Sequence, residues 1–163
     1  MHDLLTLMYC AAANTPTPAP REWWTHLSIM CALLAPNISP PSYHEDPFVL
    51  VSLFHNNFEP QTLDVAQIAE QFVHSDTGTS TMVWGPAAWR LLHELAASPL
   101  FKRVTPLLDS WTRVLPCATC RQHLADHLKK QDNADMITSK GMYEYTVMLH
   151  NAVSASLGKP VRL

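Results

Sequence analysis

The stretch LPCATCR, residues 115–121, carries the most informative chemistry of the chain. Its two cysteines, Cys117 and Cys120, are separated by two residues and follow a proline where the pattern predicts the start of a helix. Two thiols at this spacing lie within one helical turn and are able to close into a small disulfide. Three interpretations are open for the pair: a structural bridge, half of a metal site, or a redox-active dithiol.

The helix start gives the two cysteines different surroundings. Free backbone amides and the helix dipole near Cys117 favour its thiolate, which is the form that exchanges disulfides. Cys120 lies one turn deeper, so we expect it to be the more covered thiol. This difference suits a redox pair with one outer and one inner thiol.

The metal alternative extends the pair to His123 and His127, in a C-x2-C-x2-H-x3-H array. A continuous helix would distribute these four ligands around its axis, whereas zinc modules usually take their ligand pairs from separate elements. Zinc is therefore the weaker alternative. A thioredoxin-type site needs strands around the motif, and no stretch of the sequence alternates as a strand.

The composition is that of a globular protein with one main domain. The chain has 163 residues, of which 47% are hydrophobic, and a formal charge of −3. This balance provides enough apolar side chains for a core and no basic surface for nucleic acid. No apolar run approaches the ~20 residues of a transmembrane helix. We therefore expect neither nucleic acid nor a membrane among the partners.

The first part of the chain, residues 1–20, is predicted to be a flexible N-terminal arm. Residues 4–13 are mostly apolar and loosely resemble a signal peptide, but no Lys or Arg precedes them, so a cleaved signal is not favoured. Residues 14–20 are rich in proline and are typical of a linker. Because Cys10 precedes this linker, it is the candidate for a mobile shuttle thiol, whereas Cys31 lies on an apolar stripe and is typical of a core thiol.

Helical periodicity runs through the rest of the chain and predicts an all-α fold. A front helical section, residues 21–82, ends in a polar break and is followed by a denser section, residues 83–163. The expected helices cover residues 21–35, 47–58, 61–74, 86–98, 104–115, 117–130 and 137–157. The last four belong to the denser section, and the earlier ones are an additional N-terminal helical section. Gly158 stands where a C-cap glycine belongs.

Two groups of polar and aromatic side chains lie on these helices. Trp89 and His93 are four residues apart and share a helix face, a pattern that is more often core than cofactor pocket. The last helix carries a polar stripe and a lysine beyond its end: His150, Asn151, Ser154 and Lys159. Such a stripe either faces solvent or lines a polar ligand, for which the lysine offers a phosphate or ribose contact.

Three motifs in order resemble one known family. They read WGPxxWxxLH over residues 84–93, PCxxC over residues 116–120 and HNxVxxxLGKP over residues 150–160. In this order and at these separations they resemble the Erv/ALR family of FAD-linked sulfhydryl oxidases. The resemblance covers about residues 83 to 160, and its opening motif is most similar to members encoded by large DNA viruses.

The resemblance implies a thiol oxidase domain over residues 83–163, which binds FAD in a four-helix bundle and usually forms a homodimer. Electrons would pass from protein dithiols to Cys117, then to Cys120 as the flavin-proximal, charge-transfer thiol, then to FAD and O2, giving hydrogen peroxide. No metal is implied. The implied FAD-binding positions are Gly85, Trp89, His93, His150, Asn151, Val153, Ser154 and Lys159. A viral member would act in the host cytoplasm or the virion, on structural or thiol-relay proteins.

Some positions depart from the family's pattern. Pro86 stands where arginine is frequent, and Leu115 stands where tyrosine is frequent. Ser154 and Ser156 replace an asparagine and a lysine. These departures leave open a family member that binds FAD without turnover. An alternative from a different class is a non-enzymatic helical interaction module with a structural CxxC or a zinc site.

Overall fold

The computed structural model describes residues 2–40, 42–56, 80–130 and 138–161, and within these ranges every regular element is helical. The elements are α1 (His2–Ala13), α2 (Arg21–Leu34), α3 (Pro47–Asn56), α5 (Thr81–Ala97), the short 3-10 helix η1 (Phe101–Arg103), α6 (Val104–Val114), α7 (Ala118–Lys129) and α8 (Ser139–Ser156). The predicted all-α fold is confirmed. The helix expected over residues 61–74 lies outside the described residues. No described helix has both the length and the apolar character needed to cross a membrane.

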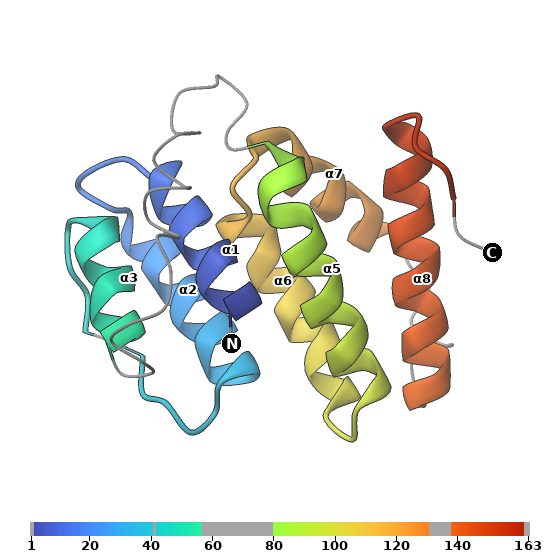
Figure 1. Ribbon diagram of the computed structural model, residues 1–163, viewed down its shortest axis with the longest axis horizontal. Helices are drawn as coiled ribbons and strands as arrows, with labels where there is room; N and C mark the ends of the chain where they lie inside the picture. Colours follow the sequence, from blue (N-terminus) through green and yellow to red (C-terminus); the bar gives the residue numbers. More distant parts are fainter. Residues whose placement is uncertain (1, 41, 57–79, 131–137, 162–163) are drawn as a thin grey trace.

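The helices are arranged around a central pair, α5 and α6 (Figure 1). On one side of this pair, α1 packs on α5 and α2 packs on α6, while α3 packs on α1. On the other side, α8 packs on α5 and α7 packs on α6. This arrangement confirms a four-helix core with an additional N-terminal helical section, which forms a second layer against the core.

Helix α1 differs from the flexible arm that the sequence predicts over residues 1–20. Nine of its 12 residues are buried, and Leu4, Leu7 and Met8 are at most 1% exposed. A helix that is apolar on nearly every side is stable only when protein surrounds it, and α3 and α5 provide that cover. The run that loosely resembles a signal peptide is therefore part of the core.

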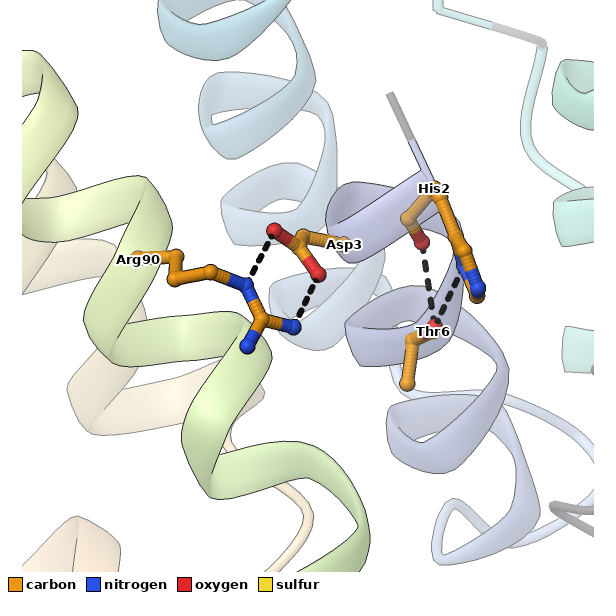
Figure 2. A network of polar contacts seen from close by, with 4 residues as sticks. All are labelled: His2, Asp3, Thr6 and Arg90. Atoms are coloured by element: carbon orange, nitrogen blue, oxygen red, sulfur yellow. Dashed lines mark hydrogen bonds and ion pairs between the residues drawn. The ribbon is translucent and has the colours of Figure 1, made fainter.

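Two arginines of the central pair join it to the N-terminal layer. Arg90 of α5 donates hydrogen bonds from Nε and Nη2 to the two carboxylate oxygens of Asp3, at 2.9 and 2.6 Å (Figure 2). The hydrogen bond from this guanidinium lowers the pKa of Asp3. Arg113 of α6 donates to Glu22 of α2 at 2.9 Å. The helices that carry the site described below are thus held from behind by α1 and α2.

Candidate active site

A cavity of about 990 Å³ lies among the helices of the C-terminal half. Its described lining residues come from α5, α6, α7 and α8 and from the segment just after α8. The volume is at the upper end of the roughly 300–1,000 Å³ range typical of small-molecule sites. The cavity is therefore the first candidate for a ligand site.

Helix α5 contributes one stripe of side chains to the cavity. Gly85, Trp89 and His93 are spaced four residues apart, so they project from the same face of the helix, and all three line the cavity. The helix begins at Thr81 because the Ser80 side chain accepts a hydrogen bond from the backbone amide of residue 82, at 3.3 Å. The shared face predicted for Trp89 and His93 is confirmed.

Helix α8 provides a facing wall through His150, Val153 and Ser154, which all line the cavity. The spacing of these residues places them on one side of the helix. Asn151, which the family resemblance implies as an FAD contact, is not among the described lining residues. Its role toward a ligand stays a prediction.

Gly158 ends α8 and brings the chain back to the cavity. Its φ is +67°, in the left-handed region that favours glycine. The amide of Gly158 donates to the carbonyl of Ala155 at 3.0 Å, and the amide of Lys159 donates to the carbonyl of Ser154 at 2.9 Å. These two bonds form a Schellman motif, which confirms the predicted C-cap glycine. Lys159, just after this turn, lines the cavity.

Aromatic rings from α5 and α8 meet inside the site. The rings of Trp89 and His150 stack with centroids 4.1 Å apart and an angle of 9° between their planes. The rings of His93 and His150 lie 5.3 Å apart at 28°. Flat ring faces of this kind are suited to contact with a planar aromatic ligand.

The hydrogen bonds of His93 and His150 define which ring nitrogens carry protons. The Thr146 hydroxyl donates to the carbonyl of Tyr143 at 2.8 Å, so it accepts from His93 Nδ1 at 2.9 Å. A neutral His93 then has an acceptor at Nε2, which lies 3.1 Å from His150 Nδ1. His150 therefore donates through Nδ1, and in its neutral form its Nε2 is an acceptor.

The two motif cysteines form a disulfide at the start of α7, with their Cα atoms 5.1 Å apart. Cys117 is the N-cap residue, and its sulfur accepts a hydrogen bond from the Cys120 amide at 3.1 Å. Arg121 donates to the carbonyl of Leu115 at 2.5 Å and closes the turn that precedes the helix. The predicted position of Cys117 at the helix start is confirmed, and the helix end stabilises negative charge on its sulfur.

The charged side chains among the described lining residues are all basic. Arg90 and Lys159 line the cavity, as do four histidines, and no Asp or Glu does. Such a wall favours an anionic ligand, because no described carboxylate repels it. Together with the stacked rings, it suits a ligand that combines a planar aromatic group with phosphates.

Comparison with known protein families agrees with this chemistry. A sequence model described as Erv1 / Alr family matches residues 86–162, which include the disulfide and most of the cavity wall. Residues 86–162 are thus similar to the Erv1 / Alr family. No solved structure gives a significant match to the chain.

Three viral proteins are similar to about half of the chain, and each is named as an FAD-linked sulfhydryl oxidase. The protein of Invertebrate iridescent virus 3 is 33% identical over 86 residues, covering 48% of this chain and 58% of the relative. That of Acanthamoeba polyphaga mimivirus is 32% identical over 85 residues, covering 47% and 59%. That of Frog virus 3 is 31% identical over 87 residues, covering 47% and 58%. The match thus spans under two thirds of each relative.

The exposure of the two cysteines in the Cys117–Cys120 disulfide differs from the sequence prediction. Cys117, predicted to be the outer thiol, is only 8% exposed and belongs to the hydrophobic core. Cys120, predicted to be the more covered thiol, is partly exposed and lines the cavity. The order reverses because the N-cap sulfur turns back against the core, whereas Cys120 faces the cavity from the first turn of α7.

The other two cysteines lie in the N-terminal layer, away from the described cavity wall. Cys10 and Cys31 are each 1% exposed, and burial raises the pKa of both thiols to about 12. The Cys31 thiol lies 3.8 Å from the sulfur of Met8. A shuttle role for Cys10 is not supported, because its helix is packed and its thiol is protonated and covered.

The four candidate zinc ligands of the C-x2-C-x2-H-x3-H array are not arranged as a metal site. Cys117 and Cys120 are joined to each other, and His123 and His127 line the cavity. Among the described residues, no group of three or more His, Cys, Asp or Glu side chains is arranged to hold a metal ion. The two histidines therefore belong to the wall of the cavity.

The sequence does not identify several residues as part of a cofactor site, including Arg90 and Trp111, and it places His127 in a metal array. Trp111 lies within the helix that the sequence predicts over residues 104–115. Its Nε1 donates to the sulfur of Met30 in α2 at 3.3 Å, so it links the cavity wall to the N-terminal layer. The periodicity of α6 predicts that Trp111 is inward, but it does not indicate which neighbour it meets.

Proposed function

We propose that the chain is an FAD-dependent thiol oxidase that forms disulfides in protein substrates. One observation carries the proposal: Cys120 of the Cys117–Cys120 disulfide lines the same cavity as the stacked rings of Trp89 and His150. A disulfide and a site suited to a planar cofactor therefore share one cavity. The names of the three viral relatives, FAD-linked sulfhydryl oxidases, support the same function.

The described residues fit the parts of FAD. Trp89, His93 and His150 offer aromatic ring faces for a planar group. Lys159 offers positive charge to a diphosphate. The remaining implied positions, Gly85, Asn151, Val153 and Ser154, lie on the same two helices. When bound, FAD supplies a two-electron acceptor that passes electrons on to O2 and yields hydrogen peroxide.

The cysteine pair takes the electrons from the substrate by thiol–disulfide exchange. A substrate thiolate attacks the sulfur of Cys117, which breaks the Cys117–Cys120 bond and releases Cys120 as a thiolate. The second substrate thiolate then attacks the substrate sulfur of this mixed disulfide and releases Cys117. The substrate leaves as a disulfide, the pair has gained two electrons, and the two thiol protons pass to the pair or to solvent.

The structure indicates how the protein assists these steps. The Cys120 amide that donates to the sulfur of Cys117 stabilises Cys117 as a leaving thiolate. Cys120 lines the cavity, which supports its proposed role as the thiol that would face the bound cofactor. Because Cys117 is only 8% exposed, a protein thiol reaches it only when the surface above it opens.

The experiment is a peroxide-release assay with a model dithiol on the purified, FAD-loaded protein. Cys117→Ser and Cys120→Ser should each abolish turnover, since either change removes the exchangeable disulfide. Cys31→Ala is the matched control, because it removes a cysteine outside the described cavity wall, and it should retain turnover. Wild-type protein that is loaded with FAD and folded but releases no peroxide would refute the proposal.

The wider setting of the proposed activity comes from the family. Protein dithiols are the substrate class, and viral structural or thiol-relay proteins would supply them. The occurrence of the three relatives in viruses supports action in a host cytoplasm or a virion. A homodimer stays a prediction, and size-exclusion chromatography with light scattering tests it.

A further inference from the structure

The Cys117–Cys120 disulfide has a positively charged neighbour that the exchange steps described above do not use. Arg121 directly follows Cys120, and its Nη1 donates a hydrogen bond to the carbonyl oxygen of Leu115 at 2.5 Å. Leu115 lies two residues before Cys117, so the Cα atoms of these two residues are within about 7 Å of each other. The hydrogen bond therefore holds the guanidinium near the start of α7, where Cys117 is the N-cap residue.

Arg121 and Cys117 lie on the same side of α7. They are four residues apart, and the amide of Arg121 donates to the carbonyl of Cys117 at 3.0 Å. Side chains of a helix lean toward its N-terminus, so the side chain of Arg121 extends back toward Cys117. Neither residue belongs to the described cavity wall, whereas Cys120 does. The guanidinium thus accompanies the sulfur that the substrate thiolate attacks in the proposed exchange.

No described carboxylate neutralises this guanidinium. None of the ion pairs in the described part of the chain includes Arg121, and the first turn of α7 contains no Asp or Glu. Partial burial lowers the pKa of Arg121, because its charged form loses water, but an arginine side chain stays protonated. The helix dipole also disfavours a cation at this end of α7. A negative charge beside the guanidinium would offset both costs.

Reduction of the disulfide creates a negative charge at the right place. In the proposed exchange, the second substrate thiolate releases Cys117 as a thiolate, which the oxidised protein does not contain. We propose that Arg121 stabilises the Cys117 thiolate electrostatically and so makes the Cys117–Cys120 disulfide easier to reduce. The inference rests on the proposed function for the exchange step. Arg121 acts only through Cys117, and it is not placed against the substrate or the cofactor.

The test measures the reduction equilibrium of the disulfide in the full chain loaded with FAD, without oxygen, in buffers of reduced and oxidised glutathione. A buffer of about pH 7.5 suits it, because a thiol at a helix start is largely ionised there. Two glutathione thiols supply the two electrons and leave as glutathione disulfide. After an acid quench and alkylation, the mass of the peptide that contains Cys117 and Cys120 gives the reduced fraction.

Arg121→Met removes the charge and keeps an apolar side chain that fills similar space. We expect its equilibrium constant for reduction to be about tenfold lower than that of the wild type, which corresponds to about 30 mV in reduction potential. Arg121→Gln keeps an amide donor for the Leu115 carbonyl but is neutral, so it should show the same loss. Arg121→Lys keeps a positive charge and should stay within about threefold of the wild type.

Lys129→Met is the matched control. Lys129 is the last residue of α7, about 18 Å along the helix axis from Cys117. The substitution removes the same charge from the same helix, and its side chain is 74% exposed. This control variant should have the equilibrium constant of the wild type.

Each outcome decides the inference. Unchanged equilibrium constants in Arg121→Met and Arg121→Gln would overturn it, since the charge would then not act on the thiolate. Equal losses in the Lys and Met variants would also overturn it, because side-chain shape rather than charge would be responsible. An equal loss in Lys129→Met would overturn it as well, as an effect of net charge alone.

Two further outcomes are covered by the same set of variants. Should Arg121→Met not fold, the difference between Arg121→Gln and Arg121→Lys decides alone. A tenfold loss in the neutral variants, together with an FAD-loaded wild type that releases no peroxide, would support the inference about Arg121 and refute the proposed oxidase function.

Discussion

The packing of α1 against the core gives a sharp prediction for Leu7→Ala. Leu7 is 0% exposed, and its helix packs on both α3 and α5. The substitution removes three buried carbons, worth about 2.4 kcal/mol of transfer free energy at ~0.8 kcal/mol each. The unfilled space adds to this, so we expect the free energy of unfolding to fall by about 3–5 kcal/mol. Such a loss is a large part of the about 5–15 kcal/mol that stabilises a typical domain.

Urea denaturation followed by far-UV circular dichroism and tryptophan fluorescence measures this change. The matched control is Leu53→Ala on α3, because Leu53 is 47% exposed and its removal should change the free energy by less than about 1 kcal/mol. The two spectroscopic transitions should coincide for each protein. If Leu7→Ala is no more destabilising than Leu53→Ala, α1 is not part of the core and the N-terminal layer described above is incorrect.

Three further predictions follow from the same contacts. Asp3→Asn should lower the free energy of unfolding by about 0.5–1 kcal/mol at about pH 7, because both partners of its ion pair are partly exposed. The pKa of Asp3 is lower in the folded protein than its unfolded value of 3.8. The stabilising contribution of Asp3 is therefore present above pH 3.8 and is lost as the pH falls through the folded-state pKa. Denaturation curves of the wild type and Asp3→Asn should accordingly converge in acid. Cys10 and Cys31 should not react with a thiol reagent in the native oxidised protein and should both react in denaturant; rapid native labelling would contradict their burial. Trp89→Ala should weaken FAD binding about tenfold through the lost ring contact, and an unchanged affinity would remove Trp89 from the site.

Helices with one polar and one apolar face were predictable from the sequence, whereas α1, which is buried on nearly every side, was not. The helix expected over residues 21–35 matches α2, and that over 104–115 matches α6, because their periodicity shows in a short window. Helix α1 lacks such a stripe, and its burial depends on α5, which begins only at Thr81, far along the sequence from the end of α1 at Ala13. Flexibility was inferred from the prolines that follow, which only end the helix.

The site was predictable to the level of helix faces. The spacing of Cys117 and Cys120 allows a disulfide without deciding between it and a metal site, and the four-residue spacing of Trp89 and His93 predicts their shared face. Which cysteine is covered depends on packing against other helices, which spacing does not report. The sequence also grouped His127 with a hypothetical metal array, since it gives no information about the cavity that this residue lines.

The most direct test of the central claim is anaerobic reduction of the FAD-loaded protein by a dithiol, followed by visible absorbance. The account predicts that the wild type loses its oxidised-flavin band as electrons pass through the disulfide. Cys120→Ser, loaded with the same amount of FAD, should keep that band, because the thiol inside the cavity is gone. Equal loss of the band in both proteins would contradict an electron path through Cys120, and so would an intact band in the wild type.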